Sequence, residues 1–530
     1  MQQVLITELA LSVCSIFFDY FCTSLQKNQT LMKKKQTLPL ITSALFALFS
    51  IQAEAGGFLT NTNQSVQFVR NPARDAVIAI DGVFSNPAGV AFMPQGVHLG
   101  ISLQSVHQKR TIDSHFAAFA TEKDHPGQDK RRFDGKADAP VVPSVQFVYN
   151  KNKWSFSGSF ALVGGGGKAQ FPNGLGSFEA AASMLPVLGR DLGIRNYSLD
   201  SYMRGRQFYY GVQVGAARKL TDNLSVFAGG RIIYATANYY GYLRNISVGL
   251  ADGSQHLASD YFYALHDKLI AAGMTDKAKQ MANLAAATED INLNCDQTGW
   301  GFTPIIGIDW QPNRHWNLAV KYEFNTDIRL KNEAANSLSA KNLPQLAQFR
   351  DGEKVSDDMP ALLGIGAQYS PIDRLRLSAG YHYYFDKQSS KFNHEEKLLR
   401  RGTYEILAGA EYDFSKLVTA SFGWQTTSYG VTDKYMKDIS FTTSSQSIGF
   451  GAAFHLSAKC TLDIGYFQTF YRSYDKEQND YNGVSSIASM VVGKEQTDAI
   501  LNSGAGNIFK GSDHFKRTNF DVAVGLTLDI

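Results

Sequence analysis

The chain has 530 residues, of which 19% are charged and 12% are aromatic, and its formal net charge is +3. A charge so close to balance gives no indication of a surface that binds nucleic acid or another polyanion. No run of about eighteen apolar residues occurs in the body of the chain, which excludes membrane crossing by helices. The mean hydropathy of −0.20 is still compatible with crossing by strands, because the two faces of membrane strands alternate.

An export signal lies unusually far from the first residue. Met32–Lys35 is a basic start, Leu38–Ile51 is an apolar stretch, and Ala53–Ala55 is a small-x-small cleavage site. This order of charge, apolar core and small residues is typical of a secretory signal peptide. We therefore predict a signal peptide over 32–55 and a mature chain that begins near Gly56.

The residues upstream of that signal add nothing that export requires. We interpret 1–31 as an extension of the gene model, with Met32 as the true start. The alternative is that the apolar stretch Leu9–Phe21 serves as a short anchor.

The segment 56–95, which follows the cleavage site, does not have the pattern of a strand. It contains two Asn-Pro-Ala units, one at Asn71–Ala73 and one formed by Asn86, Pro87 and Ala88. Proline fixes φ and asparagine bonds to its own backbone, so both units indicate tight turns. Such a segment can be tucked into the lumen of a barrel as a plug, or it can hang in the periplasm.

From Gly96 onward the chain alternates between apolar and polar residues over runs of about ten. In the last run, Phe520–Leu528, every second residue is apolar and the residues between are polar or small. A tilted membrane strand requires this pattern, but a soluble sandwich with one wet face shows it too. Aromatic residues near the strand ends favour the membrane, because their rings prefer the two membrane interfaces. These aromatic residues are Trp154, Trp310, Trp316, Tyr369, Tyr412 and Trp424.

Very short connectors join six pairs of these runs, and much longer segments link their far ends. Short turns at one end and long loops at the other indicate an up-and-down outer-membrane barrel with its turns in the periplasm. We predict an all-β fold, a transmembrane barrel of about fourteen antiparallel strands over 96–530. The predicted strands are 96–108, 142–150, 153–163, 205–219, 224–240, 299–310, 315–329, 359–370, 374–386, 402–413, 416–428, 442–456, 460–472 and 514–530. The predicted long loops are 109–141, 164–204, 241–298, 330–358, 387–401, 429–441 and 473–513.

Two of the long loops carry apolar residues at three- and four-residue spacing. This spacing predicts helices over Ser177–Leu192 and Ser259–Thr288, the second with Ser259 and Asp260 as its N-cap. Apolar helices on the outside would bind the tail of a lipid-like molecule, gaining about 0.8 kcal/mol per buried methylene. The alternative is that their side chains pack against one another or the barrel rim. The candidate ligand contacts are Phe178, Leu185, Leu188, Tyr261, Phe262, Leu265 and Leu269.

The cysteines do not suggest a disulfide or a metal site. Cys295 lies in a predicted loop and Cys460 at a predicted periplasmic turn, so we expect them at opposite ends of the barrel and too far apart to bridge. The other two, Cys14 and Cys22, precede the signal. No CxxC pair occurs, and we expect no metal and no other cofactor.

Catalytic motifs are also missing from the sequence. There is no GxSxG elbow and no HExxH, and Gly164–Lys168 lacks the spacing of a phosphate-binding loop. We therefore expect no catalytic residues and no enzyme activity. A Ser–His pair assembled across strands is the alternative that the sequence leaves open.

The mature chain resembles the FadL/TodX-type outer-membrane transporters of long-chain fatty acids and other hydrophobic compounds. The resemblance rests on Gly56–Phe58 directly after the signal, on Asn86, Pro87 and Ala88 just before the first strand, on the strand number, and on helical loops after the third and fifth strands. It implies an N-terminal hatch over 56–95 that fills the lumen, with the Asn-Pro-Ala motif in its carry-over position. The first residues of the barrel would then follow directly.

The resemblance further implies an apolar capture groove on the loops, a deeper pocket in the barrel, and a lateral exit at the third strand. Gly164–Gly167 ends that strand, and glycines weaken a ladder, so a local opening there is compatible with the sequence. A flexible start to a long loop is the alternative. The last residue, Ile530, departs from the aromatic residue with which outer-membrane barrels commonly end.

Together these features predict passive uptake of long-chain fatty acids or other hydrophobic small molecules through the outer membrane of a Gram-negative bacterium. No energy source is visible, so movement would be diffusional and gated by the hatch. A carboxylate head group would need a cation, for which Arg231 is the candidate unless it pairs with Glu323 or Glu411. The expected partners are the ligand, outer-membrane lipid and the barrel-assembly machinery, and we expect a monomer. The alternative function is a general porin or a structural barrel.

Overall fold

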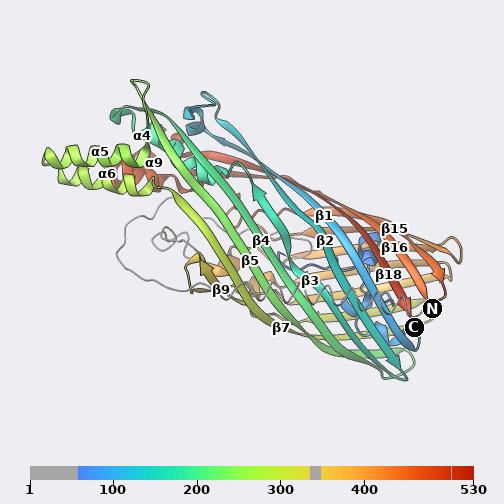
Figure 1. The fold of residues 1–530 in the computed structure, drawn as a ribbon. Coiled ribbons are helices and arrows are strands. Elements are labelled where there is room, and N and C mark those ends of the chain that lie inside the picture. The colour runs from blue at the N-terminus through green and yellow to red at the C-terminus, as the bar shows by residue number, and fades with distance from the viewer. Residues whose placement is uncertain (1–57, 335–347, 503) are drawn as a thin grey trace, which may run out of the picture. The chain divides into compact units, whose positions relative to one another are not determined.

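Fourteen long strands close into an antiparallel barrel in the computed structural model, which describes residues 58–334, 348–502 and 504–530 (Figure 1). All of these residues belong to the larger of two compact units, which begins at Thr42. The barrel strands are β1 Gly96–Phe116, β2 Lys130–Lys151, β3 Trp154–Phe171, β4 Ile194–Lys219, β5 Leu224–Leu250, β7 Ile291–Asn313, β8 Trp316–Glu323, β11 Leu362–Ile372, β12 Leu375–Tyr384, β13 Tyr404–Asp413, β14 Val418–Ser428, β15 Ser445–Ser457, β16 Cys460–Tyr471 and β18 Gly511–Asp529. The ring closes because β1 pairs with both β2 and β18.

Four short strands extend the sheet at the end of the barrel that carries the long loops. They are β6 Gln255–Leu257, β9 Arg329–Ala334, β10 Lys354–Ser356 and β17 Tyr474–Gln478. In the part of the chain that the structure describes, no helix is long and apolar enough to cross a membrane. The signal predicted over 32–55 and the extension 1–31 lie outside the described residues.

All fourteen predicted strands are present, but several are much longer than predicted. The predicted loop 109–141 lies mostly in β1 and β2, and the predicted loops 164–204 and 241–298 also contain long stretches of strand. Cys295 is accordingly inside β7 rather than in a loop, whereas Cys460 does begin β16 at a short turn. Both are free cysteines.

The strands continue beyond the membrane, and in that part their apolar side chains face the inside of the barrel instead of the outside. In the first half of β1, Leu99 and Leu103 point outward and Ser102 is buried on the lumen side. In the second half, Ile112 and Phe116 are buried inside while the charged residues between them point outward. The outside of the barrel is lipid at the first level and water at the second, so the same period of two buries opposite kinds of side chain.

The loop end of the barrel carries the helices. The predicted helix Ser177–Leu192 is α4, Gly176–Leu188, followed by a short 3₁₀ turn. The predicted helix Ser259–Thr288 is a hairpin of α5, Ala258–Ala271, and α6, Thr275–Ala287. Gly273 ends the first arm at φ +73°, which only glycine adopts without strain. The N-cap residue of α5 is Leu257, so the predicted cap at Ser259 and Asp260 was wrong.

Two further helices near the loop end, α8 Ser485–Val492 and α9 Lys494–Asn502, were not predicted. They lie in the predicted loop 473–513. They have eight and nine residues, so a three- and four-residue apolar spacing repeats too few times in either to predict a helix.

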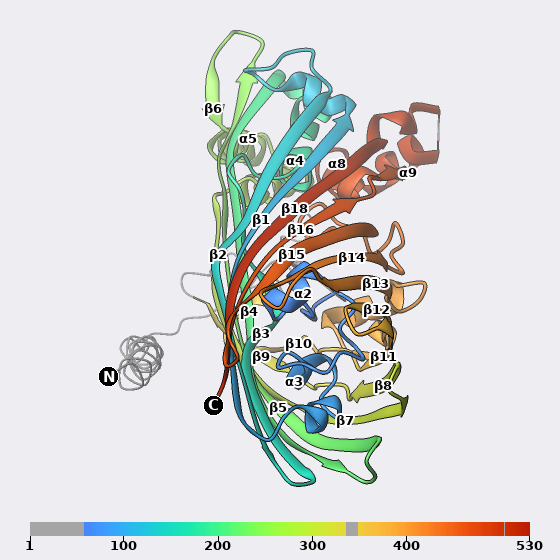
Figure 2. The same ribbon diagram turned by 90° about the vertical axis from the view of Figure 1, so that its right-hand side faces the viewer.

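Residues 58–95 lie inside the barrel, where Figure 2 shows them as short helices within the ring of strands. We call them the lumenal segment. Its elements are α2 Val66–Arg70, α3 Gly82–Ser85 and the 3₁₀ helix η1 Gly89–Phe92. Helix α2 packs against β14, β15, β16 and β18, while η1 packs against β3, β4 and β7. Nearly every side chain of the segment is buried.

Candidate transport pathway

The lumenal segment rests on a row of glycines that crosses seven neighbouring strands on the inner wall. A Cβ at Gly366 would lie 2.6 Å from the Cβ of Asp75, and one at Gly423 would lie 2.5 Å from Cδ of Pro72. Gly423 pairs directly with both Gly409 and Gly449 in the sheet. The absence of side chains lets the backbone of the segment approach the wall closely. We call this row the glycine track, and it consists of Gly366, Gly380, Gly409, Gly423, Gly449, Gly465 and Gly525.

Buried charges fix the segment to the same wall. Arg70 and Arg74 both lie 3.0 Å from Oε1 of Glu411 in β13. Arg70 also lies 3.0 Å from Asp463 in β16, and Arg74 lies 2.8 Å from Asp81 within the segment. Buried charges need partners of this kind, because an unpaired charge in the interior is costly. The five groups therefore hold α2 and the following turn in one position.

The Asn-Pro-Ala motif holds the other end of the segment. Asn86 accepts a bond from the backbone of Gly89 at 3.1 Å and donates to Asp309 in β7 at 2.6 Å. The carbonyl of Ala88 accepts from Ser225 in β5 at 2.7 Å. The motif thus caps its own turn and bonds to two strands at once.

The wall is interrupted between β2 and β3. The two strands pair from Lys136 to Asp138 and again from Val145 to Lys151, with no pairing between these stretches. On the other side of β3 the register against β4 shifts at Leu162/Gly164 and again at Gly165/Gly167. Gly165 has φ +77°, which other residues adopt only with strain. The glycine run of the third strand therefore forms a bend in the wall rather than the flexible start of a loop.

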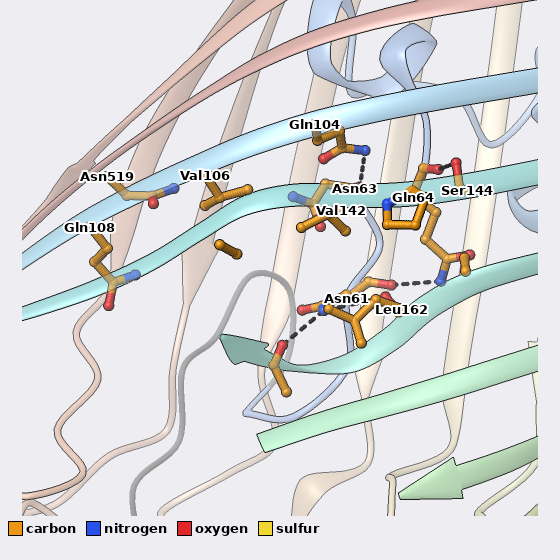
Figure 3. A pocket seen from close by; sticks show the side chains of 14 residues that line it. Asn61, Asn63, Gln64, Gln104, Val106, Gln108, Val142, Ser144, Leu162 and Asn519 are labelled. Carbon is orange, nitrogen blue, oxygen red and sulfur yellow. Dashed lines mark hydrogen bonds between the residues drawn. The ribbon is translucent and has the colours of Figure 1, made fainter. Parts of the chain in front are cut away.

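The lumenal segment covers this interruption from inside. The backbone N–H of Asn61 donates to the carbonyl of Val163 at 2.8 Å, and that of Gly165 donates to Leu59 at 3.0 Å. The side chain of Asn61 donates to the carbonyl of Gly165 at 2.8 Å. A cavity of about 50 Å³ with a mixed polar and apolar lining remains beside these contacts, and Figure 3 shows the side chains around it. Its lining includes Asn63, Gln64, Gln104, Gln108, Ser144 and Asn519.

An apolar cluster fills the loop end of the barrel. It contains all seven residues predicted as ligand contacts, which the fold therefore brings together. Phe178, Leu185 and Phe262 are fully buried in it, and the other four pack against it half-buried. A gap of about 10 Å³ remains, lined by Ala181, Leu185, Ile246, Leu284 and Ile487. The side chains pack against one another, as the alternative from the sequence had it, and their contact with a ligand stays a prediction.

Solved structures share this architecture. A FadL homologue of Pseudomonas aeruginosa aligns with a TM-score of 0.58 at 14% identity, over 89% of this chain and 100% of that chain. A deletion mutant of TodX, a monoaromatic hydrocarbon channel, aligns with a TM-score of 0.51 at 12% identity, over 88% and 99% of the two chains. This chain has the FadL-type fold. No protein-family model and no curated protein sequence matches it.

Arg231 occupies the inner wall of this FadL-type barrel, as its alternation predicted, but it is already paired. Its guanidinium lies 2.7 Å from Glu323 and donates to Gln213 at 2.7 Å. Lys321 contacts the same glutamate at 2.8 Å. The structure thus contains the salt bridge to Glu323 that the sequence offered as the alternative. A ligand head group would have to displace this carboxylate to reach Arg231.

Two other lumenal arginines were missed. Arg110 in β1 and Arg517 in β18 lie directly opposite each other, and both are buried on the inner face. Their guanidinium groups lie 5.5 Å from the ring of Phe441 and 4.4 Å from that of Tyr471, respectively. Period-two alternation would have placed both inside, but β1 was predicted to end before Arg110. Elsewhere in the described ranges, no three His, Cys, Asp or Glu side chains gather as a metal site.

Proposed function

We propose that the protein takes up long-chain fatty acids or other hydrophobic small molecules through the outer membrane by passive diffusion. The observation that carries this proposal is the interruption between β2 and β3, which the lumenal segment covers from inside. A general porin, whose solutes pass straight through the bore, does not require an interruption in its wall. Here the lumenal segment acts as a hatch, and its withdrawal from β3 opens a lateral way into the membrane.

The likeness in fold to a FadL homologue and to a monoaromatic hydrocarbon channel supports this proposal. A molecule would first be captured in the apolar cluster at the loop end, where each buried methylene gains about 0.8 kcal/mol. It would then pass along the lumen to the cavity beside Asn61. The proposal includes a location in the outer membrane and transport that is driven by diffusion alone.

The decisive experiment locks the hatch to the wall. The Cβ of Ala88 lies 3.7 Å from the position that a Cβ at Gly307 would take, which is within the range that a disulfide needs. The double variant A88C/G307C, in a background without the native cysteines, should lose uptake of labelled oleate when oxidised and regain it when reduced. Unchanged uptake in the oxidised protein would refute a moving hatch.

The second candidate function is a general porin, and conductance measured in planar bilayers distinguishes it from a plugged transporter. A plugged transporter gives no steady pore, whereas a porin gives a large and constant one. A variant that lacks residues 58–95 serves as the control, because removal of the plug should open the bore.

A further inference from the structure

The outer wall of the barrel has a hollow over β7, β8, β11 and β12. It is a shallow depression of about 550 Å³, open to the outside, and its lining is almost wholly apolar. Ala367 and Ala379, which pair directly in the sheet and point outward, form its floor. Larger outward side chains form its sides, namely Ile308, Trp310, Leu318, Ile365 and Tyr381. The hollow therefore lies on the face that the barrel turns toward lipid.

The wall is thin beneath this hollow but it is closed. Gly366 and Gly380 pair with each other on the lumen side, where they belong to the glycine track and meet Asp75. No lumenal side chain can fill the space from within. The pairing of β11 with β12 is continuous from Leu362 to Tyr369, in contrast to the interruption between β2 and β3. An occupant must therefore come from the membrane.

Two exposed arginines stand at the turn end of the same strands. Arg314 lies in the turn between β7 and β8, and Arg374 lies in the turn between β11 and β12. The two turns are neighbours, because His315 bonds to both the N–H and the carbonyl of Ser370 at 2.8 Å. Just above the turns, the rings of Trp316 and Tyr369 stack with centroids 4.6 Å apart, at the depth where aromatic residues meet the head groups.

The depth of the hollow fits the periplasmic leaflet. Ala367 lies five residues before the end of β11, which is about 16 Å along a strand and about 12 Å of depth for a strand tilted by about 40°. That depth falls within the lower half of a hydrocarbon core about 30 Å thick.

We propose that the hollow and the two arginines together bind one phospholipid of the periplasmic leaflet. One acyl chain lies over Ala367 and Ala379, and the phosphate lies between Arg314 and Arg374. The hollow is continuous with the lipid-facing band, so an acyl chain is the molecule that reaches it. Guanidinium groups bind phosphate oxygens in a fixed planar geometry. The inference depends on the barrel's place in an outer membrane and not on what the barrel transports.

Native mass spectrometry of the purified protein with added phosphatidylglycerol tests the site. The wild-type chain should retain one phosphatidylglycerol after the others are stripped. The variant A367L/A379L fills the floor of the hollow, and loss of about two methylene contacts should weaken retention about tenfold. Its matched control is A452L, an outward alanine of β15 that faces Ile464 away from the hollow, and this variant should retain the lipid as the wild type does.

The surface variant R314Q/R374Q tests the head group and leaves the strands unchanged, although it also removes the bond that Nε of Arg314 donates to His315 at 3.1 Å. It should weaken retention of phosphatidylglycerol but leave retention of a neutral diacylglycerol unchanged. Equal retention by A367L/A379L and the wild type would overturn the proposal, and so would a retained molecule that proves to be lipopolysaccharide. Oleate uptake is measured on the same variants, so that failure of the lipid site can be distinguished from failure of the proposed transport. A variant that loses the lipid but takes up oleate normally would show that the lipid site is independent of transport.

Discussion

The carboxylate of Asp75 in the lumenal segment lies 2.7 Å from Nε2 of His382 in β12. The other ring nitrogen of His382 lies 2.8 Å from Glu405 in β13, and all three groups are buried. One imidazole thus joins the segment to the wall between two carboxylates. At the same point the segment touches Gly366 and Gly380 of the glycine track, so contact by backbone and contact by charge coincide.

Replacement of this imidazole should loosen the segment. The variant His382→Phe leaves Asp75 and Glu405 buried without their shared partner, which costs about 3–5 kcal/mol for a broken buried ion pair. We expect faster cleavage of residues 58–95 by protease and a lower melting temperature by circular dichroism. The control His455→Phe removes a histidine of β15 that bonds to Thr419 and Thr461 on the neighbouring strands, and it should have little effect on the segment. Equal protection of the segment in both variants would contradict the role of His382.

A side chain on the glycine track should also displace the segment. The variant Gly366→Val puts methyl groups where the backbone of Ala76 and the Cβ of Asp75 now lie, both 2.6 Å from a Cβ at that position. Since overpacking typically costs about 1–3 kcal/mol, we expect a leaky bore that conducts in planar bilayers. Ser447→Val, an inward residue of β15 that bonds to Thr469 rather than to the segment, is the control. A silent Gly366→Val barrel would show that the track is not needed for a tight fit.

A bulky group in the lateral interruption should slow transport. Ala139 lines the cavity between β2 and β3, and Ala139→Trp would fill it with an indole ring. Because a filled cavity blocks the path proposed past β3, initial uptake of labelled oleate should fall about tenfold, which equals about 1.4 kcal/mol in the barrier. Val522→Trp, on the exposed face of β18 and away from the interruption, should leave uptake near that of the wild type. Normal uptake by Ala139→Trp would contradict the lateral route but would not contradict the role of the lumenal segment as a hatch.

The stability of the loop end of the barrel should depend on pH through Asp513 in β18. Burial, and then the negative charge of Asp438, raise the pKa of Asp513 to about 6. Its folded pKa is above the ordinary value of 3.8, so stability falls as pH rises from about 4 to about 6, by up to about 3 kcal/mol. Above that window the folded protein carries the cost of a buried carboxylate.

The side chain in the variant Asp513→Asn cannot ionise, so its melting temperature should fall less between pH 4 and pH 7 than that of the wild type. It still accepts the bonds from Ser114 and Tyr481 that now lie at 2.6 and 2.8 Å. Asp134→Asn, which alters an exposed surface pair with Lys109, should keep the pH dependence of the wild type. Identical pH profiles for wild type and Asp513→Asn would show that another group controls this part of the fold.

Much of the barrel and part of the pathway could be read from local patterns. Alternation placed Arg231 inside and named Glu323 among its partners, and the apolar spacing found Phe178 and Phe262. The lengths of the strands could not be read in the same way. Beyond residue 108 the apolar side chains of β1 lie on the inner face. This stretch lacks the outward apolar residues expected of a membrane strand, and it was therefore predicted as a loop.

The sequence by itself determined a cylinder of about fourteen alternating strands with turns at one end, because a period of two with a lipid-facing apolar side is a property of neighbouring residues. Tertiary structure alone decided that Arg70 and Arg74 meet Glu411 and that Asp75 meets His382. These partners are more than three hundred residues apart along the chain. Contacts across such distances depend on how the ring closes and which bare glycines the segment then faces, and no local pattern carries that information.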